Sequence, residues 1–526
     1  MHYFIKMKIR SRISIFYLAV LFSQAIIFSC NPSKKTVADA PVAGVEIIIL
    51  QINDVYEIAP LEGGKTAGMA RVATVFKRLR AENNNTVAVV AGDFLSPSFF
   101  NFLNYDGERI KGRQMIEVMN AAGISLVTFG NHEFDLKQDE LRQRMNESDF
   151  MWMSSNVKEI KDGVVAPFER MKDSGYFHIP ETVIIDAVDS RGNLARLGIL
   201  AVTLPFNQQA YVHYEDVLSS ARAAYDTLEK KTNLIVALTH LSIEEDIELA
   251  RQIPQLKLIM GGHDHEHMYI MEGITPIAKA DANAKTIYIH RIIYDPVTKI
   301  STVNSELKFI TDSIPEDPQT AKVVQKWMQI AESSFEKNGF NKNEVIGYSE
   351  KPLDGREASV RNHPTNLGSK ISEAIADAAR NTDLAILNAG SIRLDDQLQG
   401  AITQYDILRT LPFGGTIVEV EMKGSLLTKI LNAGFANKGT GGFLHWHNIR
   451  SDTRMDQWLV KGEAVVPQKN YIVAMPEFLL TGGESNMGFL NRENPEIVNI
   501  YEPKKNETQD LRSDIRKSVI EYFKKS

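Results

Sequence analysis

The sequence lacks several features that would place it in a particular class. Cys30 is the only cysteine among 526 residues, so neither an intramolecular disulfide nor a multi-cysteine zinc site can form. Basic residues number 59 against 66 acidic ones, and a net charge of −7 disfavours a dedicated nucleic-acid-binding protein. Beyond the N-terminal segment, no apolar run is long enough to span a bilayer. The 44% hydrophobic content is that of a folded globular protein, and the length suggests two to four domains.

The N-terminal segment has the pattern of an export signal. Four basic residues and no acidic one precede an apolar stretch from Ile13 to Phe28, which is short for a transmembrane helix. Ile26 to Cys30 resembles a bacterial lipobox, whose cysteine is lipidated after cleavage. We therefore predict a lipoprotein signal peptide over residues 1–29, a tether over residues 30–45, and lipidation at Cys30. The alternative is a plain signal peptide with an incidental cysteine.

A recurring pattern follows the tether. Short apolar, β-rich runs each end directly in polar residues of metal-ligand type. The five runs cover residues 46–52, 86–91, 125–129, 234–239 and 256–260, and they lead into Asn53-Asp54, Gly92-Asp93, Gly130-Asn131-His132, His240 and Gly261-Gly262-His263-Asp264-His265. Helices are predicted between them at residues 68–80, 112–122 and 242–252. Near-continuous apolar strands need helices on their faces, and ligands of α/β sheets gather at the carboxyl ends of strands. The pattern therefore predicts an α/β domain with a metal site.

The pattern changes after residue 312. Asp317-Pro318 reads as the start of a helix, and Val324, Trp327, Ala331 and Phe335 follow with helical spacing. Helices are then predicted at 367–380 and 424–433, with strands at 384–387 and 415–421. We predict three parts: a first domain over residues 46–312, a linker helix over 313–340, and a second αβ domain over 341–526.

The chemistry follows from the residue types at the strand ends. Carboxylate, amide oxygen and imidazole suit Zn²⁺, Mn²⁺ or a related ion. Asp93 could bridge two such ions, and a metal pair about 3.5–4 Å apart clamps a phosphoryl group and activates water. His132 follows a ligand-type residue directly and could serve as an acid near the phosphate. Asp135, three residues later, could orient its ring.

These motifs together resemble those of the calcineurin-like metallophosphatases. The motif Asn131-His132-Glu133-Phe134-Asp135 resembles that of one branch of this family, the 5′-nucleotidases and bacterial UDP-sugar hydrolases. The second domain agrees, because residues 388–393 (NAGSIR), 411–416 (LPFGGT) and 478–484 (FLLTGGE) resemble that branch's Asn-Gly-Gly-Gly-Ile-Arg, Pro-Phe-Gly and Phe-Leu-x-x-Gly-Gly-Asp blocks. The match extends from about residue 47 to residue 489, nearly the whole mature chain.

The resemblance implies a fold and a set of roles. The fold is a four-layer α/β/β/α metallophosphatase sandwich, with a smaller αβ substrate-binding domain joined by the linker helix. Metal one is bound by Asp54, Asp93 and His265, and metal two by Asp93, Asn131, His240 and His263. His132 with Asp135 forms the catalytic dyad. The substrate is held by Asn388, Arg393 and, in a less certain alignment, Arg361. Phe413 and Phe478 enclose a nucleobase, and Glu484 holds the ribose.

Some residues depart from the family pattern. The first motif is usually Asp-x-His, but here Tyr56 follows Asp54 and Val55, so an imidazole of metal one is missing. Either Tyr56 ligates a harder ion, or it packs nearby while water or Glu57 fills the position; the second reading is favoured, because a phenol pKa of about 10 makes phenolate ligation demanding. Ala389 and Ser391 replace glycines, and Glu484 replaces aspartate.

The resemblance therefore implies an exported hydrolase that depends on two divalent metal ions, such as Zn or Mn. We expect a nucleoside 5′-monophosphate as substrate, attacked by a metal-bound hydroxide, a location in the cell envelope through the lipid anchor, and no nucleic-acid partner. Rival readings are a 2′,3′-cyclic nucleotide phosphodiesterase or UDP-sugar hydrolase on the same site, a thiosulfohydrolase, and a surface binding protein with impaired catalysis. The two phenylalanines argue against the thiosulfohydrolase, and the intact dyad argues against loss of activity.

Overall fold

The structure, a computed structural model, describes residues 44–526 except 173–174, 207, 338, 380, 453–456, 504–509 and 526. The predicted signal peptide and Cys30 lie outside the described residues. Within the described part, no helix combines the length and the apolar character needed to cross a membrane.

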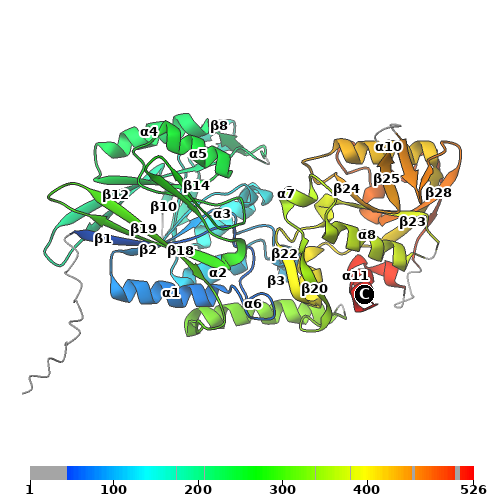
Figure 1. The fold of residues 1–526 in the computed structure, drawn as a ribbon, viewed down its shortest axis with the longest axis horizontal. Helices are drawn as coiled ribbons and strands as arrows, with labels where there is room; N and C mark the ends of the chain where they lie inside the picture. Colours follow the sequence, from blue (N-terminus) through cyan, green and yellow to red (C-terminus); the bar gives the residue numbers. More distant parts are fainter. Residues whose placement is uncertain are drawn as a thin grey trace, which may run out of the picture. The chain divides into compact units, whose positions relative to one another are not determined.

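Two six-stranded sheets form the first domain (Figure 1). The first sheet has the order β19-β18-β1-β2-β5-β6, with β1, β2, β5 and β6 parallel and β18 and β19 antiparallel. Its strands are β1 (Val45–Ile52), β2 (Thr86–Ala91), β5 (Leu126–Thr128), β6 (Met151–Met153), β18 (Thr286–Tyr294) and β19 (Ser301–Phe309). The second sheet has the order β11-β12-β14-β15-β17-β16. Its strands are β11 (Thr182–Val188), β12 (Leu194–Thr203), β14 (Leu234–His240), β15 (Ile259–Gly261), β16 (Met268–Glu272) and β17 (Thr275–Lys279).

The alternation of side chains along each strand builds the layers. In β1, Ile47 and Ile49 belong to a core shared with Leu197 of β12 and Val236 of β14, which lies between the two sheets. On the opposite face of β1, Ile48 belongs to a different core, together with the helices that cover the first sheet. These helices are α1 (Met69–Glu82) and α2 (Arg113–Ala122).

The second sheet is covered in the same way. Leu200 of β12 and Ile235 of β14 pack with α4 (Val217–Glu229) and α5 (Ile243–Gln252). A capping box begins α5, because Ser242 Oγ accepts from Glu245 N and Glu245 accepts from Ser242 N. A helix layer on each outer face and two sheets between them make the predicted α/β/β/α sandwich, which is confirmed.

One long helix follows the sandwich. It is α6 (Pro318–Lys337), and its predicted start is confirmed, because Asp317 caps the helix by accepting from Thr320 N. It packs against α1 and α2, and Trp327 Nε1 donates to Glu117 of α2. The helix is therefore fixed against the first domain along its length.

The second domain is built on a five-stranded mixed sheet with the order β24-β21-β28-β23-β29. Its strands are β21 (Leu384–Asn388), β23 (Ile417–Lys423), β24 (Leu444–His447), β28 (Asn470–Pro476) and β29 (Ile497–Tyr501), and β20 (Val345–Asp354) pairs with β22 (Gln397–Thr403) beside it. Its helices are α7 (Glu357–Val360), α8 (Asn366–Ala378), α9 (Gln404–Thr410), α10 (Gly424–Ala436) and α11 (Ile515–Lys525). Three predicted strands begin later than expected: β23 starts at Ile417 instead of 415, β15 at Ile259 instead of 256, and β5 at Leu126 instead of 125.

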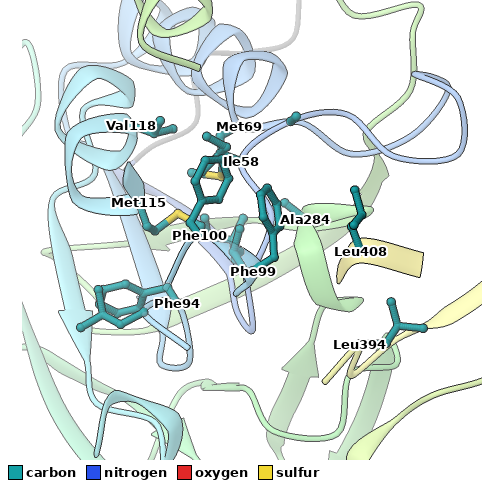
Figure 2. Packing of buried hydrophobic residues seen from close by; sticks show 14 of the residues in the cluster. Ile58, Met69, Phe94, Phe99, Phe100, Met115, Val118, Ala284, Leu394 and Leu408 are labelled. Atoms are coloured by element: carbon teal, nitrogen blue, oxygen red, sulfur yellow. The ribbon is translucent and has the colours of Figure 1, made fainter. Parts of the chain in front are cut away.

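A continuous apolar core joins the two domains. Phe99 and Ala284 of the first domain share one cluster of buried residues with Leu394 and Leu408 of the second, as Figure 2 shows. The ring of Phe99 also contacts Phe335 at the end of α6. The two domains are therefore packed together by apolar side chains as well as by the polar contacts described below.

Candidate active site

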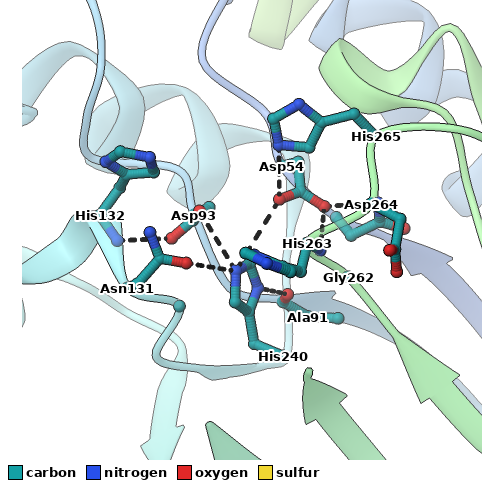
Figure 3. Close-up of polar contacts among 12 residues, drawn as sticks. Asp54, Ala91, Asp93, Asn131, His132, His240, Gly262, His263, Asp264 and His265 are labelled. Carbon is teal, nitrogen blue, oxygen red and sulfur yellow. Dashed lines mark hydrogen bonds and ion pairs between the residues drawn. The ribbon is translucent and has the colours of Figure 1, made fainter. Parts of the chain in front are cut away.

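The predicted metal-ligating side chains gather where strands of both sheets end (Figure 3). Asp54 follows β1, Asp93 follows β2, and Asn131 follows β5, all in the first sheet. His240 is the last residue of β14, and His263 follows β15, both in the second sheet. Because the two sheets pack face to face, the carboxyl ends of these strands meet at one edge of the sandwich.

The ligand atoms lie within a few ångströms of one another. Among the described residues, Asp54, Asp93 and His240 offer one ligand atom each within 4.8 Å of the others. His240 Nε2 lies 3.2 Å from Asp93 Oδ2 and 3.2 Å from Asn131 Oδ1. His265 Nε2 lies 3.3 Å from Asp54 Oδ1, and the ring of His263 lies 5.4 Å from that of His240. The structure thus brings all six predicted ligands together.

The backbone around these residues is unusual. Asp54, Asp93, His263 and His265 all have positive φ, at 52°, 54°, 82° and 63°. This conformation is uncommon for residues other than glycine and clusters at functional sites. Position 92, directly before Asp93, requires glycine, because a Cβ there would lie 2.5 Å from Gly130 N. The tight loops turn the polar side chains toward each other instead of continuing the strands.

Glu133 holds two of these loops together. Its fully buried carboxylate accepts from the backbone N–H groups of Asp93, Phe94, Leu95 and Gly130. Burial and the neighbouring Asp93 raise the pKa of Glu133 to about 7 despite these hydrogen bonds. Glu133 therefore sets the position of the metal-ligating loops, a role not assigned from the sequence although the residue lies inside the recognised motif.

His132 and Asp135 form the predicted pair. His132 Nδ1 lies 2.9 Å from Asp135 Oδ2, and Ser96 Oγ donates to the same oxygen at 2.8 Å. Burial lowers the pKa of His132, but the carboxylates of Asp135, Glu357 and Asp93 outweigh it and raise the pKa to about 10. Burial by itself would raise the pKa of Asp135, yet the charges of His132 and Arg393 hold this pKa well below its usual range. The arrangement keeps a proton on the imidazole.

Tyr56 lies inside the cluster rather than beside it. Its hydroxyl lies 3.0 Å from His265 Nε2 and 3.4 Å from Asp93 Oδ2. Burial and the charge of Asp93 raise the pKa of Tyr56 well above its ordinary value. The carboxylate of Glu57, the other residue considered for this position, accepts instead from Tyr405 Oη at 2.6 Å. The phenol is thus the group that faces the ligands of metal one.

The residues present fit a positively charged ion. Asp54 Oδ1 is buried and has no hydrogen-bond partner, with the Nε2 atoms of His265 and His240 3.3 and 4.0 Å away. His240 Nδ1 lies 2.7 Å from Ala91 O, which leaves Nε2 turned toward the carboxylates. Carboxylates and imidazole nitrogens that converge in a buried space are the donor set of a divalent-metal site.

One cavity adjoins this cluster, and another lies in the second domain. One, of about 390 Å³, is lined by Asp93, Asn131, His132, His263 and His265 and by residues of the second domain. The other, of about 540 Å³, lies within the second domain. The second cavity is lined by all six predicted substrate-binding residues: Arg361, Asn388, Arg393, Phe413, Phe478 and Glu484. Arg361 lines both cavities and therefore connects the metal-ligand cluster to this pocket.

Two of the residues that depart from the family pattern, Ser391 and Glu484, contact Asn388. Asn388 Nδ2 donates to Glu484 Oε2 at 2.8 Å, and Ser391 Oγ donates to Asn388 Oδ1 at 2.7 Å. The side chain of Asn388 is thus held on both sides by residues that differ from the family pattern. On the other side of the cavity, the ring of Phe413 lies 4.6 Å from that of Phe102 in the first domain.

Comparisons with known proteins agree with this geometry. Residues 47–267 match the family described as calcineurin-like phosphoesterase, and residues 345–491 match the 5′-nucleotidase C-terminal domain. The chain belongs to the 5′-nucleotidase family. It is a hydrolase of the metallophosphoesterase type. The predicted domain limits, 46–312 and 341–526, enclose the two matches but remain predictions.

Relatives of this family member are distant but matched over most of the chain. The bovine (Bos taurus) 5′-nucleotidase is 27% identical over 84% of this chain and 83% of its own. The trifunctional nucleotide phosphoesterase YfkN of Bacillus subtilis is 25% identical over 77% of this chain, which spans only 28% of that longer protein. The 5′-nucleotidase precursor of Thermus thermophilus superimposes with a TM-score of 0.64 at 23% identity, over 91% of this chain and 96% of its own. At that identity the likeness shows the fold.

Three residues near the site of this 5′-nucleotidase family member were not identified from the sequence. Glu357 Oε2 of the second domain lies 3.5 Å from His132 Nε2, and Asp395 Oδ1 lies 3.2 Å from His265 Nδ1. Lys279 is buried beneath the loop of His263 and His265, where it donates to Gly262 O and pairs with Asp246 and Asp264. No local pattern marks any of the three, because each acts across the fold.

Proposed function

We propose that this protein is an exported, metal-dependent phosphomonoesterase that hydrolyses nucleoside 5′-monophosphates. The observation that carries the proposal is a pair of cavities that share Arg361 in their linings. One cavity reaches the cluster of carboxylates and imidazoles, and the other is lined by Phe413, Phe478 and Glu484. A nucleotide has a phosphate for the first cavity and a base and sugar for the second.

Two divalent ions would be held by the six clustered ligands. Asp54, Asp93 and His265 would hold metal one, with the hydroxyl of Tyr56 facing it, and Asp93, Asn131, His240 and His263 would hold metal two. When bound, such a pair polarises the phosphoryl group and lowers the pKa of water. Asp93 belongs to both sets and is nearly fully buried, which excludes competing solvent from its carboxylate.

His132 would deliver a proton to the leaving oxygen. Its Nδ1 is paired with Asp135, while the residue lines the first cavity. Its pKa, raised to about 10 by the surrounding carboxylates, keeps the ring charged at neutral pH. A positioned acid of this kind contributes typically 10²–10⁴-fold to a reaction rate.

The second domain would bind the rest of the substrate. Phe413 and Phe478 are about half exposed and line the second cavity, as rings that stack a base must be. Glu484 would accept from the ribose hydroxyls, and its carboxylate is already hydrogen-bonded to Asn388. The same cavity could admit the uridine of a UDP-sugar or a cyclic nucleotide, which keeps those substrates as alternatives. The two rings disfavour a thiosulfate-bearing substrate.

The proposal is tested by chromatographic analysis of the products formed by full-length protein stripped with a chelator, because cleavage of a cyclic phosphate or of a UDP-sugar releases no free phosphate. Mn²⁺, Zn²⁺, Co²⁺ or Ca²⁺ is added to separate samples with AMP, UMP, 2′,3′-cyclic AMP, UDP-glucose or ribose 5-phosphate. We expect the nucleoside monophosphates to give the highest kcat/KM. Preference for the cyclic nucleotide or for UDP-glucose would support those alternatives, and no turnover with any metal would support the impaired binding protein.

We also propose that the mature chain is held in the cell envelope by lipid at Cys30. This rests on the sequence of residues 1–30 alone. Metabolic labelling with a radioactive fatty acid is expected to label the wild type and not Cys30→Ser. Labelling of both proteins would contradict it.

A further inference from the structure

The ring of His265 is held between two domains. Its Nε2 faces the first domain, 3.3 Å from Asp54 Oδ1 and 3.0 Å from the hydroxyl of Tyr56. Its Nδ1 faces the second domain, 3.2 Å from Asp395 Oδ1. Imidazoles that bind metals usually donate their other N–H to a carboxylate or carbonyl, which fixes the tautomer and the orientation of the ring. For His265 this group comes from a different domain.

Asp395 is built to hold this position. It lies two residues after Arg393, is 3% exposed and has a positive φ of 45°. Its Oδ1 also accepts from Glu357 N at 2.7 Å. The hydrogen bond to the backbone fixes the carboxylate before it meets the imidazole, so its direction does not depend on His265.

His240, a proposed ligand of metal two, has no such dependence on the second domain. His240 Nδ1 lies 2.7 Å from Ala91 O, a backbone atom at the end of β2 in the first domain. Asn131 Oδ1 lies against His240 Nε2, again within the first domain. The orienting contact of His240 is therefore internal to the first domain, whereas that of His265 crosses to the second.

We infer that Asp395 is a positioning residue for metal one, which the second domain supplies to a site otherwise built by the first. The inference rests on the proposed two-metal centre. Removal of Asp395 leaves the ring of His265 free to turn or to change tautomer, and the affinity for metal one falls. The affinity for metal two does not change. Orienting partners of this kind typically contribute 10–100-fold to metal affinity.

The test is stepwise metal binding to the full chain after chelator treatment. Isothermal titration with Mn²⁺ and with Zn²⁺ is carried out on the wild type, Asp395→Ala and Asp395→Asn. We expect one of the two binding steps to weaken 10–100-fold in Asp395→Ala. Asp395→Asn keeps an acceptor oxygen and should lose less. The visible spectrum of Co²⁺ bound at the weakened site should differ between Asp395→Ala and the wild type. This spectrum reports the geometry of the ligands independently of activity.

Asp396→Asn is the matched control. Asp396 is the next residue, is also buried, and also crosses to the first domain, where it pairs with Lys285 at 2.6 Å. We expect both binding steps of this variant to equal those of the wild type. If Asp396→Asn loses as much metal affinity as Asp395→Ala, the inference is overturned. The loss would then come from any weakened contact between the domains, not from the orientation of His265.

Two further outcomes separate the inference from the proposed function. If the wild type binds two metals and Asp395→Ala binds both with unchanged affinity, only the role of Asp395 is refuted. If the wild type binds no metal, the proposed function fails with it. Thermal unfolding of the chelator-treated variants verifies that each is folded. If Asp395→Ala does not fold, the metal affinity of Asp395→Asn tests the inference instead.

Discussion

Arg393 of the second domain donates to Asp135 Oδ2 at 3.1 Å, on the same oxygen that faces His132 Nδ1. One carboxylate atom thus joins a predicted substrate-binding residue to the predicted catalytic pair. The contact places the predicted reacting and binding residues in one hydrogen-bonded set, and it links the predicted pair to the second domain.

His132→Ala is expected to lower kcat for AMP by about 10²–10⁴-fold, because the proton donor to the leaving oxygen is lost. Asp135→Asn should lower kcat less, since the imidazole remains but loses its orienting charge. Initial rates of phosphate release measure both. His178→Ala, at an exposed histidine next to Glu169, is the control and should match the wild type. An unchanged rate in His132→Ala would refute the mechanism.

Tyr56→Phe is expected to weaken metal one about tenfold, because the hydroxyl facing its ligands is lost. Tyr56→His should bind metal one more tightly than the wild type, since neutral imidazole is a better ligand than a phenol with a raised pKa. Metal content after dialysis against buffered Zn²⁺ measures this. Tyr288→Phe removes a buried hydroxyl bonded to Met268 O and is the control. Unchanged metal-one affinity in both Tyr56 variants would exclude a ligand role.

Phe413→Ala and Phe478→Ala are each expected to lower kcat/KM for AMP by about 5–150-fold, the equivalent of a stacking energy of about 1–3 kcal/mol. The loss should lie mainly in KM. Ribose 5-phosphate, which has no base, should be hydrolysed as by the wild type. Phe309→Ala, an exposed phenylalanine of β19, serves as control. Equal losses with both substrates would show that the rings do not contact the base.

The stability of the protein should depend on the ionisation of Glu57. Burial raises its pKa to about 7, although Arg409 and the Tyr405 hydroxyl act in the opposite direction. The unfolded value is about 4.3, so the folded state binds the proton more tightly. The free energy of unfolding therefore falls as pH rises from about 4.3 to about 7, by about 4 kcal/mol, and this loss stays complete above pH 7.

Glu57→Gln removes this dependence while keeping an acceptor for Tyr405. The free energy of unfolding of Glu57→Gln minus that of the wild type should increase from pH 4.3 to pH 7 and then stay constant. Urea unfolding at several pH values measures the difference, with exposed Glu336→Gln as control. A difference between Glu57→Gln and wild type that is the same at pH 4 and pH 8 would contradict the assignment.

The parts of the site that could be predicted from sequence follow from local rules. Alternating and continuous apolar runs give β1, β2 and β14, and polar residues placed directly after them mark the carboxyl ends where ligands gather. The capping box of Ser242 and Glu245 is equally local, since both residues lie within one turn. The resemblance to the family motifs added the six predicted substrate-binding residues of the second domain. The structure places all six around one cavity.

What the sequence by itself determined is the set of elements and the chemical types at their ends, because strand period, helix spacing and caps depend on near neighbours. The tertiary structure alone decided which distant groups meet. It turned the hydroxyl of Tyr56 into the cluster, set Asp395 behind His265, and placed Lys279 beneath the ligand-bearing loop. These contacts depend on how two sheets and two domains pack, and no spacing along the chain encodes that packing.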